Sequence, residues 1–581
     1  MELKKIRRIS AQLAPALEQS ALHPVLQKVL SHRQIKSPEE IEYSLKNLIS
    51  FDKMMGIDRA VSLIINAIKS QQNILIVGDF DADGATSTAV CYRALNMLGH
   101  SRVSYLVPNR FDFGYGLSPE LVAVACKNKP DLLITVDNGI SSIQGVSAAR
   151  AAGIDVIVTD HHLAGAELPD ANAIVNPNQP GCGFPSKNLA GVGVIFYVML
   201  AVRAQLRKEN YFSAKRAEPN MAHLLDLVAL GTVADVVTLD ENNRILVSQG
   251  LKRMLAGKAC VGIEQILSIS GRDIKRIVAA DLGFAIGPRL NAAGRLDDMS
   301  LGIECLITDD TNRAAAIAEQ LDQLNKNRRE IEQQMQHQAN ESLKYLETSL
   351  SQGMSQKSLP YGISLYNAQW HQGVVGILAS RIKEKFNRPT IIFANDNDSI
   401  IKGSARSIKG LHIRDVLELI SSQNPGMIIK FGGHAMAAGL SLKKADFKCF
   451  ETAFNTVVEQ VLDKNALQGV IESDGELVGS DFNLALAEAI RGAGPWGQGF
   501  NEPVFDGEFE VIDWRVVGEK HLKMELQAED AEKPVSAIAF NSPASRMQQS
   551  DGFIRAAYRL DVNEFRNRKT TQLMIEYYEP V

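Results

Sequence analysis

The chain has 581 residues, of which 45% are hydrophobic and 22% are charged. At about 150 residues per domain, this length corresponds to roughly four domains, or three larger ones, each long enough to bury a core. The composition excludes a collagenous or disordered chain, and the net charge of −5 argues against a protein that coats nucleic acid with bulk positive charge.

Cysteine usage and the amino terminus bear on the compartment. The six cysteines lie far apart and form no C-x-x-C pair, so neither a zinc knuckle nor a disulfide framework is expected. The first residues, MELKKIRRISAQLAPAL, lack the apolar region of a signal peptide, and nowhere do 18 uncharged apolar residues follow one another. We therefore expect a cytoplasmic protein without a membrane span.

The first 50 residues are polar and predict a helical segment. Within them, Ser37 and Pro38 followed by glutamates predict a capped helix start in residues 37–45. Residues 51–305 then alternate short apolar runs (73–79, 131–137 and 153–160) with amphipathic stretches such as 85–99. This alternation predicts an α/β domain with a doubly wound parallel sheet. Ligands of such sheets gather at the carboxyl ends of the strands, and all three runs end in acidic residues.

The stretch from Ile303 to Gln352 contains neither Gly nor Pro. Its apolar positions repeat at intervals of four and three residues with an interruption at Arg328, and Thr311 can cap the start. We predict one long connecting helix over residues 306–352. A smaller Gly-rich α/β domain is expected over 353–462, and the short alternating strands of 463–581 predict a small barrel or sandwich.

Three carboxylates, Asp79, Asp81 and Asp83, alternate at the end of the first apolar run. On an extended backbone such residues project to one side, so that their oxygens can converge on a divalent cation that offsets their repulsion. An EF-hand loop is excluded, because Val90 stands where its bidentate Glu is required and a strand precedes the motif. From this motif alone, a haloacid-dehalogenase-like phosphatase, with Asp81 as nucleophile and Asp83 as acid, stays open.

The other strand ends favour a metal site. Asp137 follows the second run, and Asp160, His161 and His162 follow the third. A further candidate is Asp235, which follows an apolar helix. With no cysteine nearby in sequence, these ligand types suit manganese, iron, zinc or magnesium.

A basic stretch lies in the second α/β domain. Residues 371–448 contain 12 Lys and Arg residues against 6 Asp and Glu residues, a local net charge of +6. Ser404 and Arg406, together with the turn at Gly432, Gly433 and His434, combine a hydroxyl, a guanidinium and close backbone approach, as a phosphate pocket requires. Further candidates for gripping backbone phosphates are Arg110, Arg289, Asn291 and Arg295.

Four motifs, GDFDADG, VDNG, TDHH and GTVAD, resemble in this order the acidic motifs of the DHH phosphoesterase superfamily. The segments GPRLNAAGRLDD, GSARS and FGGHAMAAG resemble motifs of its RecJ branch and of the associated DHHA1 domain, and GPWGQGFNEPVF resembles the entry to the OB-like barrel of that branch. The resemblance covers residues 50–581. It implies a DHH catalytic domain, a DHHA1 substrate-binding domain and a carboxy-terminal OB-like domain.

The resemblance also implies a ligand set. Two divalent cations, Mn²⁺ or Mg²⁺, would be held by Asp81, Asp83, Asp137, His161 and Asp235, with Asp137 as the bridge. Asp79 and Asp160 would be ligands or close partners of ligands. His162 would lie beside the scissile phosphate.

The implied activity is degradation of single-stranded DNA from the 5′ end to 5′-mononucleotides, in DNA repair and recombination. The implied partners are single-stranded DNA, a single-strand-binding protein and a RecQ-type helicase, and we expect a monomer. A nanoRNase or cyclic-dinucleotide hydrolase of the same superfamily would account for the metal site but not for the long helix and third domain. A non-catalytic, Cdc45-like binder would account for the basic stretch but not for the intact ligand set.

Overall fold

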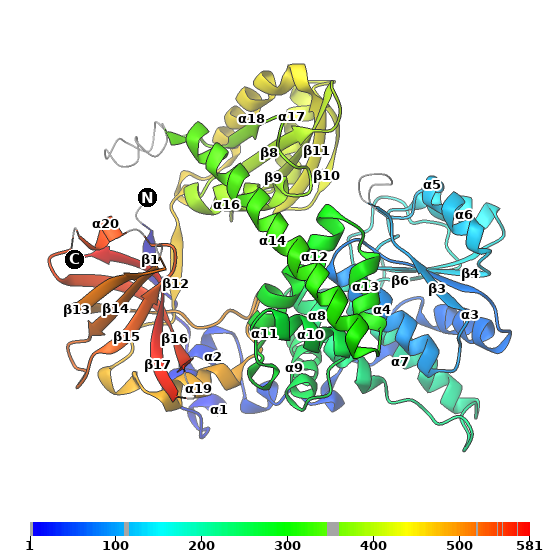
Figure 1. The fold of residues 1–581 in the computed structure, drawn as a ribbon, viewed down its shortest axis with the longest axis horizontal. Coiled ribbons are helices and arrows are strands. Elements are labelled where there is room, and N and C mark those ends of the chain that lie inside the picture. The colour runs from blue at the N-terminus through cyan, green and yellow to red at the C-terminus, as the bar shows by residue number, and fades with distance from the viewer. Residues whose placement is uncertain are drawn as a thin grey trace. The chain divides into compact units, whose positions relative to one another are not determined.

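The computed structural model describes residues 4–109, 116–344, 360–518, 521–542, 544–548, 550–565 and 568–581 (Figure 1). The chain forms two compact units. The first unit comprises Leu13–Asn325 and Ala489–Glu502, and the second comprises Met1–Gln12, Lys326–Glu488 and Pro503–Val581. In the part of the chain that is described, no helix is both long and apolar enough to cross a membrane.

A five-stranded parallel sheet forms the centre of the first unit, with strand order β3-β2-β4-β5-β6. The chain first adds β3 on one side of β2 and then continues on the other side, so the order reverses between β2 and β4. The predicted doubly wound parallel sheet is therefore confirmed. The strands are β2 (Ile74–Val77), β3 (Val103–Leu106), β4 (Leu132–Val136), β5 (Asp155–Thr159) and β6 (Ala173–Val175).

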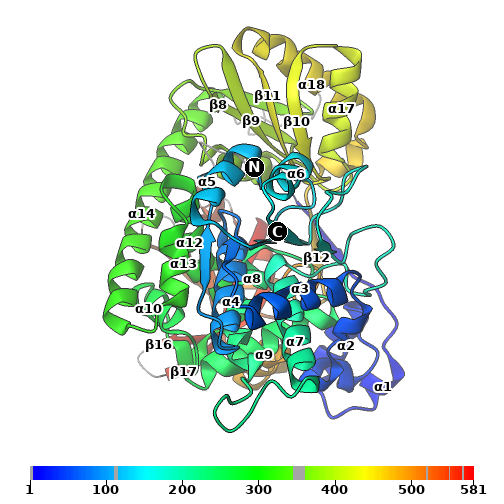
Figure 2. The same cartoon turned by 90° about the vertical axis from the view of Figure 1, so that its right-hand side faces the viewer.

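Alternation along the strands divides the side chains between two cores. Ile74 and Ile76 of β2 face a large core shared with α3, α4, α7 and α8, whereas Leu75 and Val77 face a smaller core beneath α5 and α6. Figures 1 and 2 show α5 and α6 on one side of this sheet and α3, α4 and α7 on the other. These helices are α3 (Ile57–Lys69), α4 (Ala82–Met97), α5 (Pro119–Ala125), α6 (Ile143–Ala151), α7 (Gly191–Lys208) and α8 (Leu225–Ala234).

A helical layer completes the first unit around α8, which is buried over most of its length because it is apolar on all sides. A short π-helical turn, Leu282–Ile286, leads directly into α12. The further helices are α9 (Glu241–Leu255), α10 (Val261–Ile269), α11 (Ala279–Asp281), α12 (Gly287–Leu296), α13 (Ser300–Ile307) and α19 (Leu484–Ala493), the last of which extends from the second unit into the first.

The amino-terminal 50 residues differ from the predicted helical segment. Strand β1 (Lys5–Arg8) pairs in parallel with β12 (Val470–Ser473), and no local pattern signals a partner so far along the chain. Helices α1 (Pro15–Glu18) and α2 (Pro24–His32) follow. The predicted helix start at 37–45 is a single 3₁₀ turn, Pro38–Ile41, in which the Glu40 carboxylate accepts the Ser37 N–H.

The connecting helix is shorter than predicted at its start. Helix α13 ends at Ile307, and α14 spans Thr311–Ser342. Asp310, rather than Thr311, caps it, because the Asp310 carboxylate accepts the N–H groups of Asn312 and Arg313 at 2.8 and 3.2 Å. The interruption at Arg328 is a buried ion pair with Glu332 at 2.6 Å. Residues 345–352 of the predicted helix lie outside the described residues.

The second unit contains a mixed five-stranded sheet with strand order β10-β11-β9-β8-β7. Only β7 and β8 are parallel. Helix α16 and the end of α14 share one core with this sheet, and α17 and α18 share another. The elements are β7 (Ile363–Tyr366), α16 (Val375–Phe386), β8 (Thr390–Asn395), β9 (Ile400–Arg406), α17 (Ile413–Gln423), β10 (Ile428–Gly433), β11 (Ala437–Lys443) and α18 (Phe447–Val461).

The predicted barrel is confirmed at the carboxy terminus. Five strands close in the order β13-β14-β15-β17-β16, and every neighbouring pair is antiparallel except β15 and β17. Arg8 of β1 anchors the amino terminus here through a bidentate pair with the buried Asp506 at 2.9 to 3.1 Å. The elements are β13 (Phe505–Val517), β14 (His521–Gln527), β15 (Val535–Ala539), α20 (Ala544–Met547), β16 (Phe553–Phe565) and β17 (Arg568–Pro580).

Candidate metal centre

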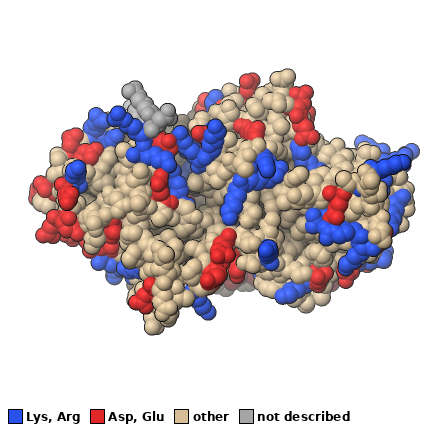
Figure 3. Space-filling view, turned by 90° about the horizontal axis from the view of Figure 1, so that it is seen from below, with Lys and Arg blue, Asp and Glu red and all other residues tan. Residues whose placement is uncertain are grey.

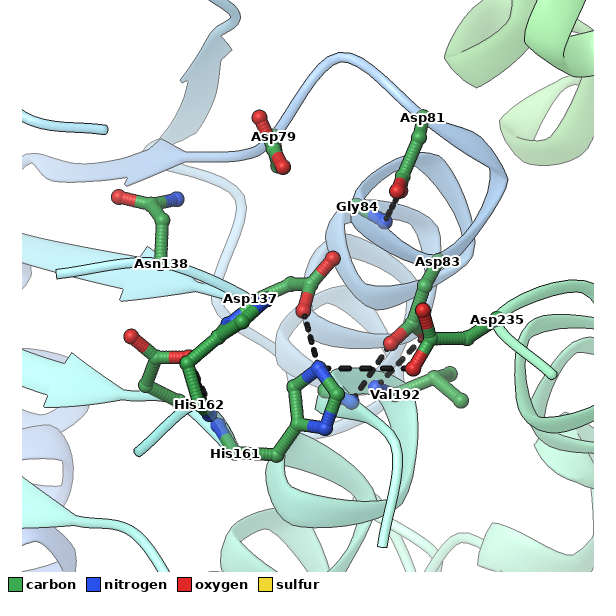
Figure 4. Close-up of polar contacts among 12 residues, drawn as sticks. Asp79, Asp81, Asp83, Gly84, Asp137, Asn138, His161, His162, Val192 and Asp235 are labelled. Atoms are coloured by element: carbon green, nitrogen blue, oxygen red, sulfur yellow. Dashed lines mark hydrogen bonds and ion pairs between the residues drawn. The ribbon is translucent and has the colours of Figure 1, made fainter. Parts of the chain in front are cut away.

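The acidic loop after β2 turns into a helix instead of staying extended. Asp81 is the N-cap of α4 and its carboxylate accepts the Gly84 N–H at 2.9 Å, so Asp83 already lies in the first helical turn. The expectation that Asp79, Asp81 and Asp83 share one side of an extended strand is therefore wrong. The strand-to-helix turn places Asp79 and Asp81 near Asp137, whereas Asp83 lies near His161 and Asp235 (Figure 4).

Asp83 is held by the amino terminus of another helix. Its two carboxylate oxygens accept the N–H groups of Gly191 and Val192, the first residues of α7, at 2.6 and 3.0 Å. The positive end of a helix dipole stabilises a buried carboxylate in this position. A side chain at Gly191 is excluded, because a Cβ there would lie 2.6 Å from Asp137 Oδ1.

Asp137 follows β4 in a left-handed backbone conformation with φ of 61°, which is uncommon for a residue other than glycine. Such strain costs of the order of 1 kcal/mol and is typical of functional sites. Next to it, the Asn138 side-chain amide donates to the carbonyl oxygens of Val77 and Val136 at 3.1 and 2.9 Å. This amide ties together the ends of β2 and β4, where the strand order reverses.

The two histidines after β5 have different surroundings. The Nε2 atom of His161 lies 3.1 Å from Asp137 Oδ1 and 3.5 Å from Asp235 Oδ2. Asp235 reaches this point from the carboxyl end of α8. By contrast, His162 Nδ1 contacts Asp160 Oδ1 at 2.8 Å.

Three groups of ligand atoms overlap in this cluster. Within each group, the atoms lie within 4.8 Å of one another. The groups are Asp79, Asp81 and Asp137; Asp83, His161 and Asp235; and Asp137, His161 and His162. Carboxylate oxygens are the donors that manganese and magnesium sites use, and imidazole nitrogens bind transition-metal ions, so these residues fit divalent cations. Sharing of Asp137 and His161 between groups suits two neighbouring cations.

Burial and mutual repulsion oppose ionisation of these carboxyl groups. Burial, followed by the charge of Asp81, raises the pKa of Asp83 to about 7. Burial and the surrounding aspartates raise the pKa of Asp137 and Asp235 well above the ordinary value. A bound cation would offset both effects.

Asp160 and His162 form a separate ionised pair. Burial opposes ionisation of Asp160, but its hydrogen bond to His162, the charge of His162 and the Ile140 N–H lower the pKa of Asp160. Burial likewise opposes a charge on His162, but Asp160, Asp79 and Asp81 raise the pKa of His162 to about 9. Asp160 therefore holds the His162 imidazole beside the acidic cluster and favours its charged form.

In the second unit, Ser404 and Arg406 lie together on β9. The Arg406 guanidinium donates to Ser404 Oγ at 3.1 Å, and burial lowers the pKa of Arg406. A Cβ at Gly376, in the first turn of α16, would lie within 3.0 Å of both side chains. The amino terminus of α16 therefore adjoins this pair, an arrangement that suits an anion.

The turn at Gly432, Gly433 and His434 belongs to the same sheet as Ser404 and Arg406. Register places Gly432 of β10 opposite Gly439 of β11, and Gly439 opposite Ser404 of β9, so the three share one face of the sheet. Gly433 has a φ of 143°, and the neighbouring His434 is exposed at the tip of the hairpin.

The remaining predicted phosphate contacts differ in their surroundings. Arg110 lies outside the described residues. Arg289 is buried against Asp322, and Asn291 accepts the Ala82 N–H at 2.8 Å. Arg295 is half-buried on α12.

Several residues of these sites escaped sequence reasoning. Gly191 and Val192 contribute backbone N–H groups, which carry no side-chain signal, although the glycines of GVGV at a helix start could have suggested close approach. The role of Asn138 carries no sequence signal because its amide bonds to backbone atoms. The role of Gly376 depends on how α16 packs against Ser404 and Arg406, and that of Gly439 depends on strand register.

Three family models match the chain. The DHH family, N-terminal domain, matches residues 73–232, the DHHA1 domain matches residues 359–463, and the RecJ OB domain matches residues 473–577.

Individual proteins are similar over nearly the whole chain. The single-stranded-DNA-specific exonuclease RecJ of Haemophilus influenzae is 51% identical over 566 residues, which cover 96% of each chain. RecJ of Escherichia coli is 50% identical over 563 residues, again covering 96% of each. The crystal structure of RecJ from Thermus thermophilus in complex with Mn²⁺ superposes with a TM-score of 0.80 at 26% identity, covering 99% of this chain and 80% of that chain.

Mn²⁺ binding should release protons and weaken as the pH falls from about 8 to about 6. The raised pKa of Asp83, Asp137 and Asp235 means that protons compete with the cations for the same oxygens. Calorimetric titration in two buffers of different ionisation enthalpy measures the release, expected to be at least about one proton per chain at neutral pH. Affinity independent of pH, without proton release, would show that the ligands are already ionised.

Proposed function

The chain belongs to the RecJ family of single-stranded-DNA-specific exonucleases, and we propose that it hydrolyses single-stranded DNA from the 5′ end and releases 5′-mononucleotides. The observation that carries this proposal is the complete acidic cluster at the edge of the sheet where the strand order reverses. A binding protein without catalysis would have no need for buried, mutually repelling carboxyl groups or for the strained backbone at Asp137.

The cluster is proposed to hold two divalent cations, Mn²⁺ or Mg²⁺. Asp79, Asp81 and Asp137 would hold one, and Asp83, His161 and Asp235 the other; Asp137 also contacts His161 of the second group at 3.1 Å. When bound there, the cations would supply an acidified water molecule and would neutralise charge on the attacking and leaving oxygens of a phosphodiester. The N–H groups of α7 keep Asp83 fixed when the substrate arrives.

His162 is proposed to act on the phosphate itself. Asp160 accepts the backbone N–H groups of Ile140, His161 and His162, so it is fixed before it binds the His162 ring. The charged imidazole would stabilise the negative charge that develops on the phosphate, or donate a proton to the 3′-oxygen that leaves. The products are a nucleoside 5′-monophosphate and a strand with a new 5′-phosphate.

The second unit is proposed to bind the sugar-phosphate backbone. Ser404, Arg406 and the amino terminus of α16 supply anion donors, and the open glycine row at Gly432 and Gly439 lets a strand approach the sheet. Gly433 and His434 are further proposed contacts of this unit, and Arg110 and Arg295 are proposed contacts of the first unit. On the face shown in Figure 3, basic and acidic side chains are interspersed.

Partners and setting follow from the family resemblance. We expect a RecQ-type helicase to supply the single strand, a single-strand-binding protein to hold it, and the protein to act as a cytoplasmic monomer. Co-purification of each candidate with the full chain, with and without single-stranded DNA, tests these expectations.

Replacing either Asp81 or Asp137 by Ala should reduce hydrolysis by more than about 100-fold, because even outer partners of metal ligands contribute 10- to 100-fold. Strand binding without divalent cations should be retained, since each change removes a negative charge. The assay uses a 5′-labelled, 5′-phosphorylated single strand with Mn²⁺, in parallel with its duplex, a dinucleotide and a cyclic dinucleotide. The exposed Asp170, replaced by Ala, is the matched control.

Early release of the labelled mononucleotide from the single strand alone is the expected result. Full activity in the Asp81 or Asp137 variant would contradict the ligand assignment. Late release of the 5′ label would contradict the direction, and hydrolysis of only the dinucleotide or cyclic dinucleotide would contradict the substrate.

Arg406→Lys should weaken binding of single-stranded DNA several-fold, because a lysine cannot reproduce the bidentate guanidinium contact. The slope of the logarithm of the binding constant against the logarithm of the salt concentration should stay unchanged, because lysine retains the charge. Arg406→Ala should make this slope shallower by about 0.7. Fluorescence anisotropy in EDTA at several salt concentrations measures both quantities. Arg414, exposed on α17, gives the matched Lys and Ala controls, and an equal effect at both positions would contradict a specific phosphate contact.

A further inference from the structure

Helix α12 contacts the acidic loop at two points. Asn291 Oδ1 accepts the Ala82 N–H at 2.8 Å, and Ala82 stands between Asp81 and Asp83. One turn further along, Gly294 packs so closely that a Cβ there would lie 1.8 Å from the carbonyl oxygen of Phe80. Asn291 and Gly294 are three residues apart and therefore share one face of the helix.

The same helix is anchored on another side to α14. Arg289 lies two positions from Asn291 and points elsewhere, and its guanidinium contacts Asp322 of α14 at 2.8 to 2.9 Å. It also donates to the carbonyl oxygen of Ala285 at 2.7 Å, within the π-helical turn that precedes α12. Arg289 and Asp322 are both buried, so the pair fixes the helix with little competition from water.

We propose that α12 is a positioning element of the metal centre, in which Asn291 sets the acidic loop through the Ala82 N–H and Asp322 of α14 holds the helix in place through Arg289. This inference rests on the proposed function of the acidic cluster. It gives Asn291 and Arg289 a task different from the phosphate contact that their sequence motif suggests. Asn291 is a positioning residue, since it acts through the two carboxylates on either side of its partner.

The contact has a large effect because Ala82 is buried. A buried N–H group that loses its acceptor must move toward another one or stay unsatisfied, and either change shifts the backbone between Asp81 and Asp83. Those two carboxylates belong to different ligand groups. A small shift of the loop therefore alters the spacing of both proposed cation positions.

The test compares Asn291→Ala and Asp322→Asn with Asn172→Ala in the full chain. Asn172 is the matched control, because its Oδ1 also accepts a backbone N–H, that of Val156 at 2.8 Å, but at the opposite end of the strands. Calorimetry gives the Kd for Mn²⁺, anisotropy gives the affinity for single-stranded DNA in EDTA, and thermal unfolding checks the fold.

Asn291→Ala should raise the Kd for Mn²⁺ by about 10- to 100-fold, as expected for an outer partner of a metal site, and Asp322→Asn should raise it by less. DNA affinity in EDTA should change by less than about twofold, and Asn172→Ala should leave both quantities unchanged. Unaltered Mn²⁺ affinity in Asn291→Ala would overturn the inference, as would a loss of DNA affinity with Mn²⁺ affinity retained. Failure of the unaltered chain to degrade DNA would contradict the proposed function instead, whatever the Mn²⁺ affinities of the variants.

Discussion

Repulsion among carboxylates at one edge of a parallel sheet is the constraint on which this structure depends. Burial and repulsion raise the pKa of Asp83, Asp137 and Asp235, so the fold must hold these groups against their own preference for water. It does so with backbone N–H donors of α7 and with glycine at Gly191, where no side chain fits. The same repulsion favours the binding of cations, because a bound positive charge offsets the repulsion among the carboxylates.

The placement of the cluster follows from topology. Strand order reverses between β2 and β4, and ligands of parallel sheets gather at the carboxyl ends of the strands at such a point. Asn138 donates to the ends of both strands, and Asn291 of α12 accepts an N–H of the acidic loop. The negative edge and the basic stretch of residues 371–448 also explain how a chain of net charge −5 can act on nucleic acid. Positive and negative side chains gather in different parts of the chain, so the net charge says little about the substrate.

The carboxyl ends of the strands could be predicted from the sequence, because each is a hydrophobic run followed by Asp or His. Asp137 and His161 could thus be predicted to lie at the same edge of the sheet, whereas Asp235, which follows a helix, entered the predicted ligand set through the family resemblance. Contacts made by backbone atoms, or between residues far apart in sequence, could not be predicted from the sequence. The turn that places Asp83 in α4, the cap at Asp310 and the pairing of β1 with β12 are of this kind. Arg289 and Asn291 show the same limit, since a motif reveals polar side chains but not which way they face.

The central claim is that the acidic cluster binds two divalent cations. Anomalous diffraction at the manganese edge, from crystals grown with excess Mn²⁺, tests it most directly. The account predicts two peaks, one in contact with Asp79, Asp81 and Asp137 and the other in contact with Asp83, His161 and Asp235. A single peak, or peaks away from these side chains at saturating Mn²⁺, would contradict it.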